Sequence, residues 1–561
     1  MDAGGMAHWR AVDIRDGNRG FAMTTVLAHE IGPTSEPLWG STIGENLART
    51  VAEFGGNDAL VSCHQGIRWT YDEFAVRVRS LAVGLLGRGL AVGDRVGLWS
   101  PNYAEWVLVQ YATAEIGVIL VNLNPAYRTH ELAFALRHSG CRMVIAAPSF
   151  KSSDYRAMLA EVGDDCPAME SAVFFWDPEW DALAAGEGGA VAADVVARGA
   201  SLSSDDPINI QYTSGTTGFP KGATLSHRNI VNNGRFTSVL QGITDQDRIC
   251  IPVPFYHCFG MVMGNLGCTT HGATIVIPGD AFDPLAVLQA VESERCTSLF
   301  GVPTMFIAEL AHDRFREFDL SSLRTGVMAG SPCPAEVMKA CIDTMHMVDV
   351  TICYGMTETS PVSTQTIPGD TLEHQTATVG RAHPHVEIRI ADPETGATVD
   401  RTMPGEFCTR GYSVMTGYWN DPDRTAAAID TDGWMHTGDL AVMADDGYVE
   451  IVGRIKDMVI RGGENIYPRE IEEFLYTHPE VADVQVVGVP DAKYGEELVA
   501  WIKPKPGCTP TDEDIRQFCR GSIAHFKVPR YVRFVDEFPM TVTGKVRKVE
   551  MREQSIVELG L

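Results

Sequence analysis

The chain has 561 residues, of which 45% are hydrophobic and 21% are charged. These values exclude an intrinsically disordered protein and predict a globular protein of roughly two to four structural units. The 45 Lys and Arg residues stand against 73 Asp and Glu residues, and the resulting formal charge of -28 disfavours nucleic acid and anionic membrane surfaces as partners.

The cysteines indicate the cellular compartment, and the apolar segments indicate whether a membrane association is expected. The 13 cysteines are scattered through apolar stretches and form no CxxC pair, which predicts reduced cysteines in a cytoplasmic protein and argues against a zinc centre. Residues 106–121 are the most apolar stretch, but Glu115 lies within it, so we expect a buried helix and no integral membrane association. Residues 1–22 lack an apolar core and are predicted to be a disordered tail, not a signal peptide.

The first three-quarters of the chain alternates short apolar strands with helical patterns. A strand at residues 95–99 is followed by a helix from about Ala104, and further strands are predicted at residues 143–147, 208–212, 273–277, 298–302 and 325–329. This alternation is typical of α/β layers with largely parallel sheets. Residues 166–204 are rich in Ala, Gly and acidic residues, and we expect a variable surface segment there.

The pattern changes near residues 453–457, after a predicted strand at 447–451. Beyond it, we predict a compact α+β unit with a helix at 468–476, strands at 484–489 and 497–503, and a helix at 511–519 opened by a capping box at Thr511. The predicted fold is therefore α/β, with a large multi-layer N-terminal α/β domain at residues 23–455 and a small α+β C-terminal domain at residues 456–561.

The densest chemical signal is the stretch YTSGTTGFPKG at residues 212–222, which follows a predicted strand. Glycines let the backbone approach an anion, and successive N–H groups form an anion-binding concavity. Hydroxyl groups and a lysine add further donors, although the spacing is not that of a Walker loop. The candidate phosphate ligands are Thr213, Ser214, Gly215, Thr216, Thr217, Gly218 and Lys221.

This loop resembles the phosphate loop of the adenylate-forming (AMP-binding) superfamily, which includes acyl-CoA synthetases, adenylation domains of peptide synthetases and luciferases. The resemblance continues in order along the chain, through YGMTET at 354–359, GWMHTGDL at 433–440, YVEIVGRIKD at 448–457, RGGENIYPREI at 461–471 and PMTVTGKVR at 539–547. The overall pattern, including WGSTI at 39–43, resembles the medium-chain acyl-CoA synthetase branch.

The resemblance implies an ATP site. It makes Glu358 the ligand of Mg²⁺, a cation that prefers carboxylate oxygens, and it makes Asp439 and Arg454 the ribose contacts. A carboxylate can accept hydrogen bonds from both ribose hydroxyls. The adenine is expected to lie against residues 330–332 (Gly330, Ser331 and Pro332) and Tyr354, and Gly355 and Thr357 are further expected cofactor-binding residues.

The resemblance also implies the catalytic groups. Lys545 is expected to stabilise the charge that builds up as pyrophosphate leaves, with Thr213, Lys221 and Glu358 on the phosphates. His257 is expected beside the reacting carboxylate, although a structural core histidine remains an equal alternative. The glycines and methionines of residues 260–267 are expected to leave room for an acyl tunnel.

The implied reaction has two halves. A carboxylate and Mg·ATP give acyl-adenylate and pyrophosphate, and the CoA thiolate then displaces AMP. The small domain is expected to rotate about Lys456 between the two steps, which withdraws Lys545 and brings Gly463 to the pantetheine channel.

A fatty acid is the favoured substrate because residues 252–272 lack an obvious Asp to pair a substrate ammonium and no carrier module follows Lys545. Four alternatives remain open: a ligase that loads a carrier protein, an aryl or other carboxylic acid–CoA ligase, a luciferase-type oxygenase, and a ligand-binding protein without catalysis. The last is disfavoured because Glu358 and Lys545 are both present.

Overall fold

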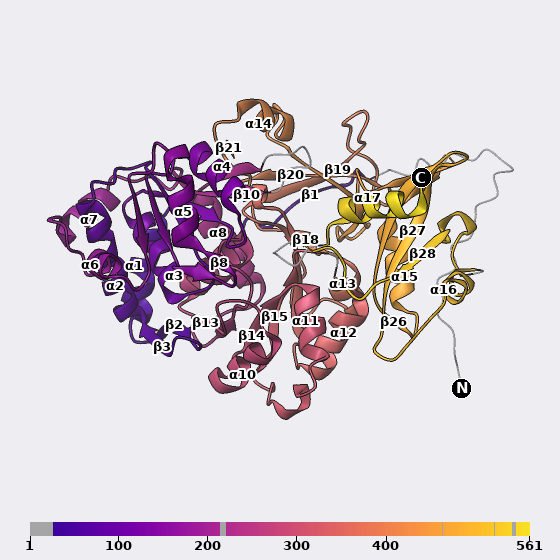
Figure 1. The fold of residues 1–561 in the computed structure, drawn as a ribbon, viewed down its shortest axis with the longest axis horizontal. Helices are drawn as coiled ribbons and strands as arrows, with labels where there is room; N and C mark the ends of the chain where they lie inside the picture. The colour runs from indigo at the N-terminus through magenta and orange to yellow at the C-terminus, as the bar shows by residue number, and fades with distance from the viewer. Residues whose placement is uncertain (1–25, 214–219, 332, 463, 521, 541–545) are drawn as a thin grey trace.

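The computed structural model describes residues 26–213, 220–331, 333–462, 464–520, 522–540 and 546–561, and the predicted tail at residues 1–22 lies outside them. Two large, mostly parallel sheets and a smaller antiparallel sheet occupy the chain up to Arg454, and a separate sheet occupies the remainder (Figure 1). This is the predicted architecture of a large α/β part and a smaller α+β part.

The seven-stranded sheet is parallel except at one edge. Its order is β21 (Gly417–Tyr418), β11 (Lys221–Ser226), β10 (Pro207–Thr213), β5 (Ile119–Leu123), β4 (Arg95–Trp99), β6 (Met143–Ala146) and β9 (Ser171–Phe174). Strand β11 runs antiparallel to both of its neighbours. The helices before and around these strands are α2 (Tyr71–Gly87), α3 (Ala104–Glu115), α4 (Thr129–Ser139), α5 (Tyr155–Val162), α6 (Pro178–Ala184) and α7 (Ala192–Gly199).

The nine-stranded sheet is parallel from β16 to β2 and antiparallel at both ends. Its order is β18 (Arg381–Ala382), β17 (Val362–Gln365), β16 (Asp349–Gly355), β15 (Thr325–Ala329), β14 (Ser298–Gly301), β12 (Arg248–Cys250), β13 (Thr274–Ile277), β2 (Asp58–Ser62) and β3 (Ile67–Thr70). Its connections include α8 (His227–Leu240), a π-helix at Phe259–Leu266, α9 (Gly267–His271), α10 (Pro284–Glu294), α11 (Pro303–Leu310) and α12 (Ala335–Thr344).

The five-stranded antiparallel sheet completes the larger part. Its order is β1 (His29–Ile31), β19 (Val386–Ala391), β20 (Gly405–Gly411), β22 (Met435–Met443) and β23 (Val449–Arg454). The other elements of this part are α1 (Ile43–Phe54), the β7–β8 pair (Ser149–Phe150 and Ser153–Asp154), α13 (Leu372–Ala377), α14 (Pro422–Ala428) and short 3₁₀ turns at Gly163–Asp165, Phe315–Glu317 and Thr357–Thr359.

The smaller part is a mixed sheet with helices on both faces. Its strands are β25 (Glu464–Ile466), β24 (Val459–Arg461), β27 (Gly495–Pro504), β26 (Val481–Asp491) and β28 (Tyr531–Phe534). Helices α15 (Pro468–Tyr476) and α16 (Asp512–Cys519) bury side chains in one core, and α17 (Lys548–Leu559) buries Met551 in a second. A 3₁₀ turn at His525–Lys527 precedes β28, and the predicted capping box at Thr511 is confirmed.

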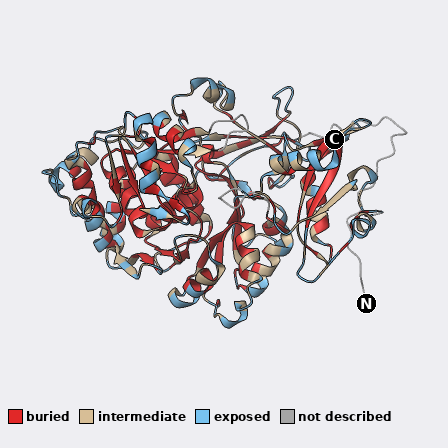
Figure 2. Ribbon diagram, in the orientation of Figure 1, coloured by how far each residue is buried: buried red, intermediate tan, exposed pale blue. Residues whose placement is uncertain are grey.

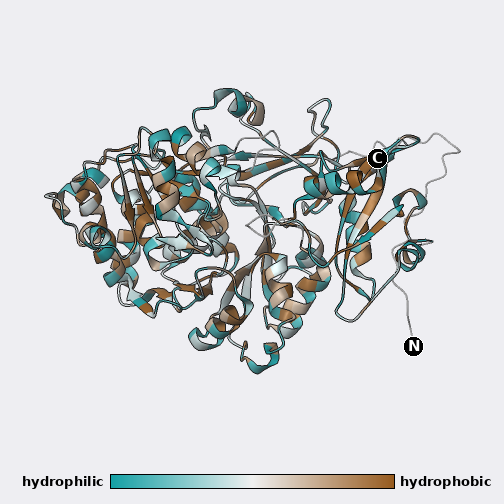
Figure 3. Cartoon of the chain, viewed as in Figure 1, coloured by the Kyte–Doolittle hydropathy of each residue, from teal (hydrophilic) through white to brown (hydrophobic). Residues whose placement is uncertain are grey.

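Four main apolar clusters stabilise these layers, and buried residues follow the sheets in Figure 2, as apolar residues do in Figure 3. One cluster joins the seven- and nine-stranded sheets, for example through Val96 and Ile249. Another joins the nine-stranded sheet to the antiparallel sheet through residues such as Leu299 and Phe407. The clusters of the smaller part begin at Val459 and share no residue with these.

Two local expectations were wrong. Helix α3 is buried along its whole length, but it ends at Glu115, and residues 119–121 belong to strand β5 because Gly117 reverses the chain with φ +70. Residues 166–204 are not merely a surface segment, since β9 pairs with β6 and extends the sheet. None of the described helices is long and apolar enough to cross a membrane.

Candidate active site

Two parallel strands of the nine-stranded sheet end at one edge and carry two of the predicted nucleotide blocks. Ala329 of β15 pairs with Cys353 of β16, so the residues that follow, Gly330 and Tyr354, leave the sheet side by side. The carboxyl ends of parallel strands are where open α/β sheets bind ligands. Gly330 is exposed and has φ +90, a conformation that favours glycine, and the neighbouring Ser331 is half-buried.

Gly355 is required because the neighbouring backbone leaves no room for a side chain. A Cβ at this position would lie 1.8 Å from the carbonyl oxygen of Pro361, so no other residue fits without moving the chain. This close approach folds the backbone into the 3₁₀ turn Thr357–Thr359 directly after β16. The turn holds Glu358 at the same edge of the sheet, with its residue only 3% exposed.

Tyr354, Asp439 and Arg454 form one connected group. The Tyr354 hydroxyl donates to Asp439 Oδ2 at 2.7 Å, and Arg454 Nε donates to Asp439 Oδ1 at 3.0 Å. Asp439 and Arg454 are direct cross-strand partners on β22 and β23, which explains how residues fifteen apart come together. The edge of the Tyr354 ring meets the Phe407 ring at 5.0 Å.

The electrostatics of this group follow from burial and charge. Burial raises the pKa of the Tyr354 hydroxyl well above its ordinary value, and the Asp439 carboxylate raises it further. The same carboxylate raises the pKa of Arg454. The tyrosine is therefore neutral and the arginine charged throughout the physiological range, so both act as donors to Asp439.

A second group forms around Glu358. Thr213 Oγ1 donates to Glu358 Oε1 at 3.3 Å, and the Tyr418 hydroxyl donates to the same oxygen at 2.8 Å. Lys221 Nζ donates to the Tyr418 hydroxyl at 2.8 Å and lies 4.4 Å from the centre of its ring. Glu358 Oε2 takes part in none of these bonds. The group joins the ends of β10, β11 and β21 to the turn after β16.

Lys221 is held in a partly desolvated setting beside groups of both charges. Burial lowers the pKa of its ammonium group, the charges of Arg424 and Lys456 lower it further, and Glu358 opposes the shift. The charge of the predicted hinge lysine, Lys456, therefore acts on the phosphate-loop lysine in this arrangement.

His257 lies near the Glu358 turn but is bonded locally. Its Nδ1 accepts from the Phe259 backbone N–H at 3.2 Å, which fixes the start of the π-helix. The next residue, Cys258, places its Sγ 3.8 Å from Thr357 Oγ1, so the His257 segment packs directly against the Glu358 turn. Both readings of His257 from the sequence, a substrate neighbour and a structural histidine, therefore remain predictions.

The glycines expected to leave room for an acyl chain are instead closely packed. A Cβ on Gly260 would lie 2.5 Å from the Pro254 oxygen, and a Cβ on Gly264 would lie 2.8 Å from Ile251 Cδ1. All residues of the π-helix Phe259–Leu266 are buried. These glycines serve close packing of the segment, so the expectation that they open a tunnel was wrong.

Several predicted residues lie outside the described part of the chain: Ser214, Gly215, Thr216, Thr217, Gly218, Pro332, Gly463 and Lys545. Beside Gly463, Arg461 is tied into its own sheet, with Nε and Nη2 donating to Glu497 at 2.8 Å each and Nη1 donating to the Phe526 oxygen at 3.2 Å. Both side chains are nearly buried, so this bidentate pair anchors β24 to β27.

Tyr418 is the functional candidate that sequence reasoning missed. It belongs to none of the quoted blocks, and its strand β21 is two residues long. Its position follows from pairing with Ala223 on β11, immediately after the phosphate loop. The available signal was the aromatic cluster Tyr418–Trp419 after Gly417, which alone would indicate core packing.

Comparisons with known proteins identify the family of the chain. The family model "AMP-binding enzyme" matches residues 47–419, and "AMP-binding enzyme C-terminal domain" matches residues 470–545. The Bacillus subtilis protein YngI is 49% identical over 93% of this chain and 98% of its own length. The mitochondrial medium-chain acyl-CoA ligase ACSF2 of Danio rerio is 45% identical over 96% of this chain and 92% of its own length.

One of the similar solved structures contains a bound adenylate. The anthranilate CoA ligase AuaEII, in complex with anthranoyl-AMP, superposes with a TM-score of 0.82 at 26% identity over 94% of this chain and 99% of its own. The first family model includes the group around Glu358, and both relatives align over at least 93% of the chain. The chain therefore belongs to the AMP-binding enzyme family of adenylate-forming ligases.

Proposed function

We propose that this protein is an acid–thiol ligase that forms acyl-CoA from a medium- to long-chain fatty acid, ATP and CoA through an acyl-adenylate. The observation that carries the proposal is the pair of polar groups, Tyr354–Asp439–Arg454 and Thr213–Glu358–Tyr418–Lys221, at one edge of the central sheets. The 45% identity to a medium-chain acyl-CoA ligase supports the fatty acid as substrate.

The first group fits a nucleoside. Tyr354 and Arg454 each donate to a different oxygen of Asp439, which orients the carboxylate, and a carboxylate can accept from the two ribose hydroxyls. Arg454 neutralises the charge of Asp439 and keeps the carboxylate oriented. The Gly330 and Tyr354 strand ends supply a neighbouring surface for the adenine, with the flat tyrosine ring held by Phe407.

The second group fits the phosphates. Glu358 is a buried carboxylate whose Oε1 accepts hydrogen bonds from two hydroxyl groups. A carboxylate that is oriented in this way suits a ligand of Mg²⁺, which prefers oxygen ligands. A Mg²⁺ ion held by Glu358 would supply positive charge to the phosphate oxygens of ATP. Lys221 and Thr213 donate to the phosphates, and Lys545 is proposed to reach the same region from the C-terminal part.

The second half-reaction assigns a role to the smaller part. Its two apolar clusters are independent of those before Arg454, which supports a unit at residues 456–561 that moves as a body against residues 23–455. Movement about Lys456 would exchange Lys545 for Gly463 at the adenylate. The 13 free cysteines support a reducing, cytoplasmic setting for this enzyme.

Pyrophosphate release tests the proposal with a series of acids from acetate to octadecanoate, each with and without CoA. We expect the highest kcat/KM for a medium-chain acid and thioester formation with free CoA. Thioester formed only with an acyl carrier protein, or a preference for benzoate or anthranilate, would overturn the assignment of acceptor or acid. A lack of pyrophosphate release with every acid would overturn the adenylation step itself.

A further inference from the structure

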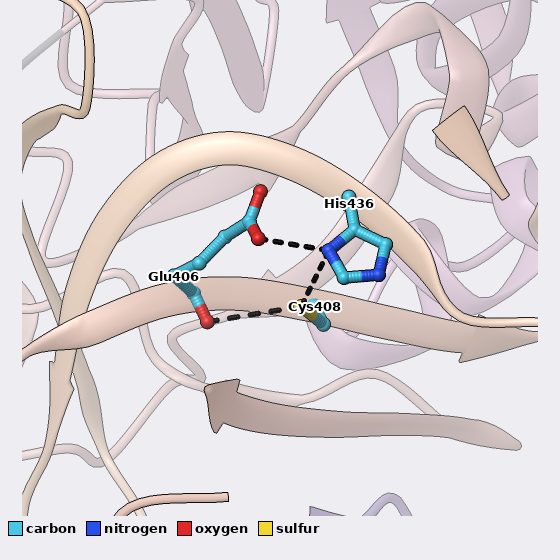
Figure 4. A group of neighbouring side chains, drawn as sticks. All are labelled: Glu406, Cys408 and His436. Atoms are coloured by element: carbon cyan, nitrogen blue, oxygen red, sulfur yellow. Dashed lines mark hydrogen bonds and ion pairs between the residues drawn. The ribbon is translucent and has the colours of Figure 1, made fainter. Parts of the chain in front are cut away.

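Strands β20 and β22 bring three metal-ligating side chains together outside the two polar groups of the ATP site: Glu406, Cys408 and His436 (Figure 4). Cys408 is the direct cross-strand partner of His436. Glu406 lies two residues before Cys408 and shares its face of the strand, while Phe407 between them points into the apolar cluster on the other side. These residues are 28 and 30 positions from His436, so no short sequence motif reveals them.

The distances suit a small cation. Cys408 Sγ lies 3.6 Å from His436 Nδ1, and Glu406 Oε2 lies 2.8 Å from the same nitrogen. In tetrahedral zinc coordination, a Zn–S bond of about 2.3 Å and a Zn–N bond of about 2.0 Å place sulfur and nitrogen about 3.5 Å apart. The sulfur and nitrogen are thus already placed, and the carboxylate oxygen needs to withdraw from the nitrogen by about 0.5 Å to reach the separation of two zinc ligands.

The residues around the cluster favour a metal site over a simple hydrogen bond between His436 and Glu406. Asp430 Oδ2 lies 3.6 Å from His436 Nε2, on the far side of the ring. A carboxylate in that position orients a histidine whose other nitrogen holds a metal. The His436 side chain is 31% exposed and that of Glu406 is 13% exposed, so a hydrated ion can reach the site.

The type of ligand selects the type of ion. Thiolate and imidazole favour Zn²⁺ or Co²⁺ over Mg²⁺ and Ca²⁺, which prefer oxygen ligands. Binding releases the Cys408 thiol proton to solvent and requires a neutral imidazole with Nδ1 unprotonated. Thiolate and carboxylate together balance the two charges of the ion, so the occupied site is neutral and can remain largely buried.

The cluster is connected to the proposed ribose contact. Glu406 Oε1 accepts from the Gly438 backbone N–H at 3.0 Å, and Gly438 directly precedes Asp439. His436 lies on the same strand, three residues before Asp439. Widening the gap between Glu406 and His436 therefore shifts β22 at His436 and at Gly438, on the side of Asp439 nearest the cluster. The bonds of Asp439 to Tyr354 and Arg454, at 2.7 and 3.0 Å, leave that segment of β22 little freedom to adapt.

We propose that Glu406, Cys408 and His436 form a Zn²⁺ site, separate from the Mg²⁺ position at Glu358, whose occupation weakens ATP binding through the segment of β22 that carries Asp439. Binding at this site is independent of the proposed fatty-acid specificity. Its effect on ATP rests on the proposed ribose role of Asp439, and the two parts are tested separately.

Cobalt absorption tests the site itself, without any enzymatic turnover. Titration of the full chain with Co²⁺ is expected to give a thiolate-to-cobalt charge-transfer band that saturates at one ion per chain and is reversed by Zn²⁺. Cys408→Ala should abolish the band, and Asp430→Asn, which acts through His436, should weaken Co²⁺ affinity by roughly 10- to 100-fold. The matched control is Cys63→Ser, which removes an exposed thiol directly after β2, a strand of the nine-stranded sheet, and should leave the band unchanged.

The absence of a charge-transfer band in the wild-type chain, or its persistence in Cys408→Ala, would overturn the site. Where Cys408→Ala fails to fold, Glu406→Gln provides the second variant, because it keeps the side-chain shape and removes the ligand charge. It should weaken Co²⁺ binding by about 100-fold or more, since loss of a ligand exceeds loss of an outer partner.

Steady-state kinetics test the coupling. At buffered free Zn²⁺, the KM for Mg·ATP is expected to rise in the wild type and in Cys63→Ser, and to stay constant in Cys408→Ala. The KM for the acid should change in none of them. An equal rise of the ATP KM in all three proteins, or no rise where cobalt binding is established, would overturn the coupling and leave a site without influence on ATP.

Discussion

Tyr418 connects the lysine of the phosphate loop to the proposed Mg²⁺ ligand, and Tyr418→Phe removes that connection while keeping the ring. The hydroxyl makes two bonds of 2.8 Å, one from Lys221 Nζ and one to Glu358 Oε1. Both partners are charged, and a hydrogen bond to a charged group contributes about 1.5–3 kcal/mol. Glu358 keeps its bond from Thr213, so we expect a net loss in that range and not twice as much.

The loss should affect the first half-reaction. At about 1.36 kcal/mol per tenfold change, 1.5–3 kcal/mol corresponds to a fall in kcat/KM for Mg·ATP of roughly 10- to 150-fold. ATP–pyrophosphate exchange with a medium-chain acid measures this step directly. Thioester formation from supplied acyl-adenylate and CoA should change by less than about twofold, because neither Lys221 nor Glu358 stabilises charge in that step.

The matched control is Tyr155→Phe. Its hydroxyl also makes one strong bond, to the Pro125 oxygen at 2.6 Å, and the residue is fully buried away from the cluster. This variant should lower the free energy of unfolding by about 1 kcal/mol and leave exchange unchanged. Equal exchange rates in Tyr418→Phe and the wild type, with a normal fold, would refute the idea that the tyrosine positions Lys221 and Glu358.

Three further outcomes follow from the site. Asp439→Ala should raise the KM for ATP by roughly 10- to 150-fold, from a loss of about 1.5–3 kcal/mol, and an unchanged KM in steady-state kinetics would remove the ribose assignment. Burial lowers the pKa of Lys221 below its ordinary value of 10.5, and only the ammonium form binds phosphate. As the pH rises, kcat/KM for ATP should therefore begin to fall below pH 10.5, and Lys221→Arg should shift that fall to higher pH. Lys545→Ala should slow adenylation by roughly 10²–10³-fold but spare thioester formation. Gly463→Leu should instead slow thioester formation and spare adenylation. Equal damage to both steps in each variant would contradict a rotating C-terminal domain.

The sequence predicted the strands of the parallel sheets well because each is short, apolar and bounded by polar turns. The predicted strand at 325–329 has the observed bounds, and so does the helix at 468–476. The predictions failed where hydrophobic periodicity does not distinguish a buried helix from a buried strand. Residues 119–121 continue the apolar run of α3 but belong to a strand, and only the positive φ of Gly117 separates the two elements.

The site was predictable block by block but not as an arrangement. The pairing of Asp439 with Arg454 required the register of β22 and β23, and spacing along the chain does not reveal register. Tyr418 and the Glu406–Cys408–His436 cluster were missed for the same reason, since their partners lie on other strands. The glycines at 260 and 264 were misjudged because a glycine in a sequence indicates either open space or close packing, and Pro254 and Ile251 show close packing.

The two polar groups also explain why adenylation and thioester formation can be divided between parts of one chain. Tyr354 comes from the nine-stranded sheet and Asp439 from the antiparallel sheet, while Lys221 and Glu358 join the seven-stranded sheet to the nine-stranded one. Each group is thus held by bonds between two sheets, and such donors and acceptors are oriented before any ligand arrives. The side chains named in the two groups all precede residue 455, and the smaller part packs around its own clusters. Its movement can therefore change which residues face the adenylate without disturbing the side chains that hold the nucleotide.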